Sequence, residues 1–172
     1  MSVFRPDITV FRIWELNPRQ LKQEGIHAIF MDLDNTLAVW NGMMIEDRTL
    51  RFLSEAREAG FFLCIVSNNH AERILPVAEK LNLPFLEAAN KPLPFRLKKQ
   101  MLSQGLHPQE CMLVGDQVMT DLPAGNLIGM RTVLTVPIDT RKEFWWTYIN
   151  RILEHFLLRC MGIHLPTKPK TP

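Results

Sequence analysis

The chain has 172 residues, 47% of them apolar and 22% charged, and carries a formal net charge of +2. This length fits one globular domain with a full core, and the small charge does not favour a nucleic-acid partner. The first residues lack the apolar stretch of a signal peptide, and no window reaches the roughly 20 apolar residues of a membrane span. We therefore expect a cytoplasmic protein that binds no nucleic acid.

Short apolar runs alternate with helix-patterned stretches along the chain, which is typical of an α/β protein with a parallel sheet. The predicted strands are 28–33, 61–66, 84–88, 111–114 and 132–136, and the predicted helices between them are 47–59, 71–81, 96–103 and 122–127. The continuous apolar run 61–66 indicates a strand buried on both faces. The sequence thus predicts one core domain over about 26–136, within a domain of residues 1–139.

Two carboxylates, Asp32 and Asp34, come at the end of the first predicted strand. Alternate residues of a strand face the same way, so the two side chains would converge if the strand continued. Folding alone does not favour such a pair, whose repulsion is relieved by a hard cation with oxygen ligands, Mg²⁺ above all. The pair therefore predicts a functional site.

Polar residues also follow each of the next three predicted strands. Ser67 and Asn68 follow the second strand, Lys91 follows the third, and Asp116 and Asp121 follow the fourth. The carboxyl ends of parallel strands share one edge of the sheet, where open α/β sheets bind ligands. Residues far apart in the sequence should therefore gather in one crevice.

This set of side chains fits phosphoryl transfer. A carboxylate can attack phosphorus and form an acyl phosphate if a cation relieves the repulsion between the two anions. Mg²⁺ between a carboxylate and the phosphoryl group would do so, with Asp116 completing the metal site. Lys91 adds a positive charge, and the hydroxyl of Ser67 with the following backbone N–H groups can hold phosphoryl oxygens. A second carboxylate can donate a proton to the leaving oxygen and later activate water.

In this order, the residues resemble the four motifs of the haloacid dehalogenase (HAD) superfamily: Asp32-Leu33-Asp34-Asn35-Thr36, Ser67, Lys91 and Gly115-Asp116…Asp121. The resemblance implies a three-layer, Rossmann-like α/β fold. It also implies that Asp32 is the nucleophile and that Asp34 is the general acid and base. The presence of Asp34 favours a phosphatase over a dehalogenase, because dehalogenases lack the second carboxylate.

The resemblance also assigns ligands. Ser67, Asn68 and Lys91 would bind the phosphoryl group. Asp32 and Asp116 would ligate Mg²⁺, and Asp34 would add its backbone carbonyl. Asp121 would support the ion from the first or the second coordination shell.

The intervals between the motifs leave no room for the cap domain that many superfamily members carry, so we expect a capless enzyme with an open crevice. Within the superfamily, the strings DLDNTL and Val66-Ser67-Asn68-Asn69, with Glu72-Arg73 and Lys91-Pro92, resemble the bacterial YqeG family of class IIIA phosphatases. That family is similar to the mitochondrial phosphatidylglycerophosphate phosphatases. The resemblance implies a phosphorylated substrate, preferably the lipid phosphatidylglycerophosphate.

Residues 140–172 have a different character, with a helix predicted over 141–161 and a basic, proline-containing end. At helical spacing, one side carries the apolar Trp145, Ile149, Ile152, Leu153, Phe156 and Cys160, and the other side carries Lys142, Thr147, Asn150, Arg151, Glu154 and His155. Such a helix can lie in a membrane interface, at the inner face of the membrane. Packing on the sheet and a seam between two copies of the chain are the alternatives.

Three rival functions fit parts of the pattern. A soluble phosphatase for nucleotides or sugar phosphates would carry the same motifs. A receiver-like signalling domain also has an acidic cluster and a lysine on one sheet edge, but its phospho-accepting aspartate follows the third strand, where this chain has Asn90-Lys91. A binding protein that keeps the fold without turnover would show decayed motifs, which this sequence does not.

Overall fold

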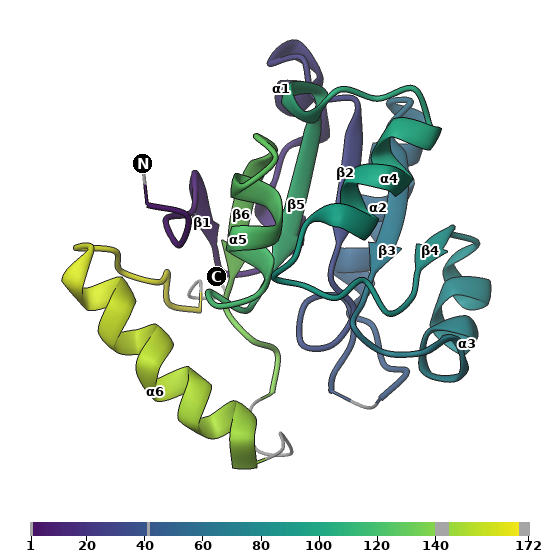
Figure 1. Cartoon of the computed structure of the whole chain (residues 1–172). Helices are drawn as coiled ribbons and strands as arrows, with labels where there is room; N and C mark the ends of the chain where they lie inside the picture. The colour runs from purple at the N-terminus through teal and green to yellow at the C-terminus, as the bar shows by residue number, and fades with distance from the viewer. Residues whose placement is uncertain (1, 41, 140–144, 169–172) are drawn as a thin grey trace.

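The computed structural model describes residues 2–40, 42–139 and 145–168, although the side chains of 145–151 and 155 are not described. In this part of the chain, six parallel strands form one sheet in the order β1-β6-β5-β2-β3-β4 (Figure 1). The strands are β1 (Ile8–Val10), β2 (Ala28–Met31), β3 (Phe62–Val66), β4 (Phe85–Leu86), β5 (Cys111–Gly115) and β6 (Arg131–Thr135). The helices are η1 (Ile13–Glu15), α1 (Pro18–Gln23), α2 (Asp47–Glu58), α3 (Ala71–Leu81), α4 (Phe95–Ser103), η2 (Pro108–Glu110), α5 (Asp121–Asn126) and α6 (Trp145–Cys160).

The helices cover both faces of the sheet, which gives three layers. Side chains alternate along each strand, so Ile29 and Met31 face one layer and Ala28 and Phe30 face the other. The first layer contains α1, α2 and α3, and the second contains α4 and α5. This arrangement confirms the predicted Rossmann-like α/β fold and explains why the central strands are apolar throughout.

The chain order reverses at the centre of the sheet. From β2 the chain proceeds outward through β3 to β4, and then returns to place β5 on the other side of β2. Ligands of open α/β folds bind at such a reversal, outside the carboxyl ends of the strands. The crevice is therefore expected beyond Met31 and Gly115, where the loops that follow β2 and β5 begin.

The five predicted strands and the four helices between them are confirmed, with shifts of a few residues at their ends. The elements β1, η1 and α1 near the start of the chain, and η2 before β5, were not predicted. The edge strand β1 pairs with β6 and is only three residues long, too short to show a periodic pattern. Helix α1 has six residues, begins at Pro18, and is capped by the side chain of Asn17.

The predicted C-terminal helix is present as α6, whereas residues 141–144 of the prediction lie outside the described residues. Its orientation differs from packing on the sheet through the apolar side. Glu154, predicted on the polar side, is buried against the domain, while Ile152, Leu153 and Phe156 of the apolar side are exposed. None of the helices among the described residues is long and apolar enough to cross a membrane.

Candidate active site

Three buried carboxylates meet at the carboxyl edge of the sheet. Asp32 follows β2, Asp116 follows β5, and Asp121 is the first residue of α5. Their carboxylate oxygens lie within 4.8 Å of one another, and the three residues are 7%, 2% and 2% exposed. Because like charges at this spacing repel strongly in a desolvated site, the cluster needs compensating positive charge.

Lys91 supplies part of that charge. Its Nζ lies 2.5 Å from Oδ1 of Asp32 and 2.6 Å from Oδ1 of Asp121, and it also donates to the carbonyl oxygen of Val66 at 3.1 Å. All three ammonium protons thus have acceptors. Burial by itself lowers the pKa of Lys91, but the charges of Asp121 and Asp32 outweigh it and raise the pKa, so Lys91 stays protonated.

The pKa of Asp32 is raised well above its ordinary value. Burial is the largest cause, the positive charge of Lys91 opposes it, and the nearby charges of Asp121 and Asp116 raise the pKa further. A further cation beside Asp32 would favour its ionised form.

The loop after β3 fixes Lys91 in place. The side-chain amide of Asn68 donates to the carbonyl oxygen of Lys91 at 2.9 Å and accepts from its backbone N–H at 2.8 Å. Ser67 is buried at the end of the same strand, and its hydroxyl oxygen accepts from the backbone N–H of Asn69 at 3.2 Å. Asn68, predicted as a phosphate ligand, thus uses its carbonyl oxygen and one of its two amide N–H donors to position Lys91.

Asp34 is not part of the carboxylate cluster. Its Oδ1 accepts from Nη2 of Arg73 at 2.6 Å, and its Oδ2 accepts from Nδ2 of Asn69 at 2.6 Å. Nη2 of Arg73 also donates to the carbonyl oxygen of Gly42 at 2.9 Å. Asn35, with a left-handed φ of 64°, turns the chain directly after Asp34.

The loop between β5 and α5 holds Asp116 and Asp121 in place. The backbone N–H of Gln117 donates to Oδ2 of Asp121 at 3.0 Å, and the hydroxyl of Thr36 donates to Oδ1 of Asp116 at 3.3 Å. A Cβ on Gly115 would lie 2.1 Å from Oδ2 of Asp121. Only glycine therefore allows this carboxylate to lie so close to the end of β5.

A pocket of about 220 Å³ opens over these residues, and Asp32, Asp34, Ser67, Asn68 and Lys91 all line it. Sequence reasoning assigned no role to several other lining residues: Asn35, Trp40, Asn69, Gln117 and Thr120. Arg73, quoted above only as part of a family motif, was not predicted to be the partner of Asp34. Nothing in the spacing of single polar residues on loops or helix surfaces pointed to these contacts.

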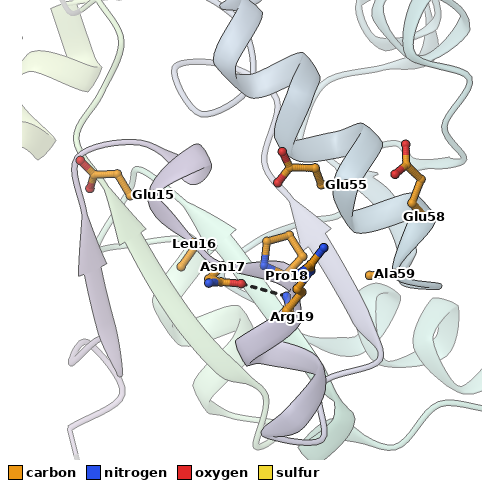
Figure 2. A pocket seen from close by; sticks show the side chains of 8 residues that line it. All are labelled: Glu15, Leu16, Asn17, Pro18, Arg19, Glu55, Glu58 and Ala59. Atoms are coloured by element: carbon orange, nitrogen blue, oxygen red, sulfur yellow. Dashed lines mark hydrogen bonds between the residues drawn. The ribbon is translucent and has the colours of Figure 1, made fainter.

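A larger pocket of about 820 Å³ lies elsewhere, between the start of α1 and the end of α2 (Figure 2). Its walls carry Glu15, Glu55 and Glu58, with Arg19 beside Asn17, the residue that caps α1. Because α2 leads into the amino end of β3, this pocket is at the edge opposite the candidate site. It contains none of the residues that fit phosphoryl transfer.

Comparison with known proteins decides the family. A model of the haloacid dehalogenase-like hydrolases matches residues 12–129. The chain belongs to this family. It is also 34% identical over 158 residues to a Bacillus subtilis (strain 168) protein named "Probable phosphatase YqeG", covering 92% of this chain and 91% of that one. The protein is accordingly a HAD-type phosphatase, as the order of the motifs predicted.

Two other similarities are more distant. The chain is 25% identical over 183 residues to "Phosphatidylglycerophosphate phosphatase 1, chloroplastic" of Chlamydomonas reinhardtii, covering 99% of this chain and 68% of that one. A crystal structure of 3-deoxy-D-manno-octulosonate 8-phosphate phosphatase from Moraxella catarrhalis, with magnesium and phosphate ions, superposes with a TM-score of 0.55. That match covers 70% of this chain and 75% of the other at 16% identity, so it supports the fold alone.

Proposed function

We propose that this HAD-type phosphatase is a Mg²⁺-dependent phosphomonoesterase that works through a phosphoryl group carried on Asp32. The observation that carries this proposal is the buried contact of Asp32 with Lys91, beside the carboxylates of Asp116 and Asp121. A surface acidic cluster would need no buried lysine, whereas a nucleophile that approaches a phosphate dianion needs positive charge around it.

The donor set fits magnesium. Three buried carboxylates cluster here and one ammonium group contacts two of them, which leaves negative charge to compensate, and all donors are hard oxygens. Asp32 and Asp116, with the backbone carbonyl of Asp34, would hold the ion, and Asp121 would support it. When bound, Mg²⁺ neutralises charge on the phosphoryl oxygens.

The chemistry itself is carried by the side chains of the pocket. An oxygen of Asp32 attacks phosphorus while the bond to the ester oxygen breaks, and the leaving oxygen takes the proton held by Asp34. The positive charge of Lys91 attracts the phosphoryl oxygens, and the hydroxyl of Ser67 donates to one of them. Asp34, now ionised, takes a proton from the water that attacks phosphorus and releases inorganic phosphate, which regenerates Asp32.

The proposed substrate is phosphatidylglycerophosphate, which the enzyme would convert to phosphatidylglycerol at the cytoplasmic face of a membrane. Similarity to the Chlamydomonas phosphatase of that name supports this choice. The intervals between the motifs also support it: 68–90 hold only α3 and β4, and the described residues of 35–66 hold a loop, α2 and β3. No cap domain thus encloses the pocket, which leaves room for a large substrate.

Phosphate release from a panel of esters tests this proposal. The panel contains phosphatidylglycerophosphate in mixed micelles, a nucleotide, a sugar phosphate and p-nitrophenyl phosphate, each with Mg²⁺ and with EDTA. We expect Mg²⁺-dependent turnover with the highest kcat/KM on the lipid. Preference for a nucleotide or a sugar phosphate would favour the rival soluble phosphatase. Turnover that EDTA leaves unchanged would contradict the metal site.

A matched pair of variants tests whether Asp116 contributes to Mg²⁺ binding. Asp116→Asn removes one proposed ligand and should raise the Mg²⁺ concentration needed for half-maximal activity. Asp47→Asn changes an exposed aspartate at the start of α2 and should leave that concentration unchanged.

A further inference from the structure

Helix α6 packs against the domain through one narrow side. Leu158 is 4% exposed and joins Val118, Leu122 and Leu134 in a small hydrophobic cluster. The chain after the helix returns to this cluster, where Met161, Ile163 and Leu165 are partly buried. The helix is therefore docked on the domain, and its outward side is well defined.

That outward side is mainly apolar, with the exposed Arg159 on it three residues after Phe156. Ile152, Leu153 and Phe156 are 58%, 44% and 62% exposed, and Cys160 is exposed one turn further on. These positions follow the spacing of residues that share one helix face. Large apolar side chains grouped in this way mark a surface that binds something. We call these four residues the outer face of α6.

We propose that the outer face of α6 rests in the interface of an anionic lipid bilayer and holds the enzyme at the membrane. The proposal extends the function proposed above, because a phosphate ester on a lipid must be reached at the bilayer surface. Charge supports this occupant: residues 140–172 contain six Lys or Arg against two Asp or Glu, whereas residues 1–139 contain fourteen against sixteen. A basic, amphipathic segment is attracted to anionic headgroups while its apolar side chains enter the boundary.

A second copy of the chain is a less suitable occupant. A two-fold contact through the outer face would bring two positively charged segments together. The four described side chains of the outer face also fall short of the roughly 800 Å² per partner that a stable interface buries. Since no described helix can span a bilayer, α6 would lie along the surface rather than cross it.

The buried side of α6 contacts a loop of the candidate active site. Oε1 of the buried Glu154 accepts from the backbone N–H of Met119 at 3.2 Å, and Met119 lies in the loop between Asp116 and Asp121. The helix and the loop that carries two of the clustered carboxylates therefore form one packed unit. A bilayer bound by the outer face would lie on the far side of α6 from this loop, about one helix diameter away.

Co-sedimentation of the full-length protein with vesicles tests the proposal without any substrate. One vesicle set contains phosphatidylcholine and phosphatidylglycerol in equal parts, and the other contains phosphatidylcholine alone. Ile152→Ser/Phe156→Ser removes the centre of the outer face. Leu102→Ser/Leu127→Ser is the control, because both residues are exposed to a similar degree at the ends of α4 and α5. We expect wild type and control to sediment with the anionic vesicles, and the outer-face variant to lose at least nine-tenths of that binding.

A fluorophore on Cys160 gives a second measurement, since Cys64 and Cys111 are buried. The emission of this fluorophore should shift to the blue when anionic vesicles are added.

Three results would each overturn the proposal. The first is binding of the variant Ile152→Ser/Phe156→Ser to the anionic vesicles as strong as that of wild type, and the second is the absence of any binding by wild type. The third is a wild-type dimer that Ile152→Ser/Phe156→Ser dissociates. Hydrolysis of p-nitrophenyl phosphate is measured in parallel and should be equal in all variants. If wild type binds the vesicles but does not hydrolyse p-nitrophenyl phosphate, the proposed function is refuted and the proposed membrane contact is still supported.

Discussion

Arg73 and Asp34 form an ion pair in which Nη2 lies 2.6 Å from Oδ1, and the same nitrogen donates to the carbonyl oxygen of Gly42. This contact ties the proposed general acid to α3 and to the loop after β2. If Asp34 protonates the leaving oxygen, its position must be exact to a fraction of an ångström, and Arg73 determines it together with Asn69.

Arg73→Met should therefore lower kcat/KM about 10²-fold on an alkyl phosphate such as glycerol phosphate. The loss on p-nitrophenyl phosphate should be much smaller, because its leaving group departs without a proton. Steady-state kinetics on both esters measures the difference. Arg57→Met, which removes an arginine bound to the carbonyl oxygen of Leu81, is the control and should change neither value. Equal losses on both esters would assign Arg73 a structural role.

Lys91→Met should destabilise the protein in EDTA. It removes the ammonium group that lies between Asp32 and Asp121 and leaves buried carboxylates without their partner. Loss of one partner of a buried pair costs about 3 kcal/mol or more. Thermal unfolding with and without Mg²⁺ should show a lower Tm than wild type in EDTA. Lys98→Met, an exposed lysine of α4, serves as control. A Tm equal to wild type would contradict the role of Lys91 as the central counter-charge.

Asp32→Asn should have the opposite effect on stability in EDTA. The folded-state pKa of Asp32 is raised, so the folded protein binds more protons than the unfolded chain between the ordinary pKa and the raised one. The stability of wild type therefore falls as pH rises through this window, and the asparagine removes that loss. The Tm of Asp32→Asn should exceed that of wild type by a margin that grows from acidic to neutral pH. A lower Tm for the variant at neutral pH would contradict this sign.

Gly115→Ala should disrupt the metal site from the backbone side. The added methyl group would overlap the carboxylate of Asp121, so the carboxylate must move away from Lys91 and Gln117. We expect Mg²⁺-dependent activity to fall about 10²-fold. Gly105→Ala meets no atom within 4 Å and has a φ of +68°, so it should cost about 1 kcal/mol of stability and leave activity intact. Full activity in Gly115→Ala would mean that Asp121 needs no fixed position.

The position of the site could be predicted because it follows from topology. Buried parallel strands read as continuous apolar runs, and the polar residues after them must meet at one edge. Asp32, Lys91, Asp116 and Asp121 were brought together on that basis alone, and the structure places them within hydrogen-bonding or ligand distance of one another. Elements such as β1 and α1 are too short to show a periodic pattern of apolar residues, so the sequence did not predict them.

Contacts between loops and helices could not be predicted in the same way. The pairing of Arg73 with Asp34 depends on the turn at Asn35 and on the rotation of α3, and neither is fixed by an apolar pattern. The orientation of α6 likewise depends on which side of the helix forms contacts with the rest of the domain. Glu154 is buried because Met119 offers a backbone donor there, whereas Phe156 stays exposed.

Trapping of the covalent intermediate tests the central claim most directly. The enzyme is mixed with Mg²⁺ and p-nitrophenyl phosphate and quenched in acid within the first turnover, and its peptides are examined by mass spectrometry. One phosphoryl group should be found on the peptide that contains Asp32. In Asp32→Asn the modification should be absent and turnover should fall by several orders of magnitude. Phosphate release by Asp32→Asn within tenfold of wild type would contradict the account.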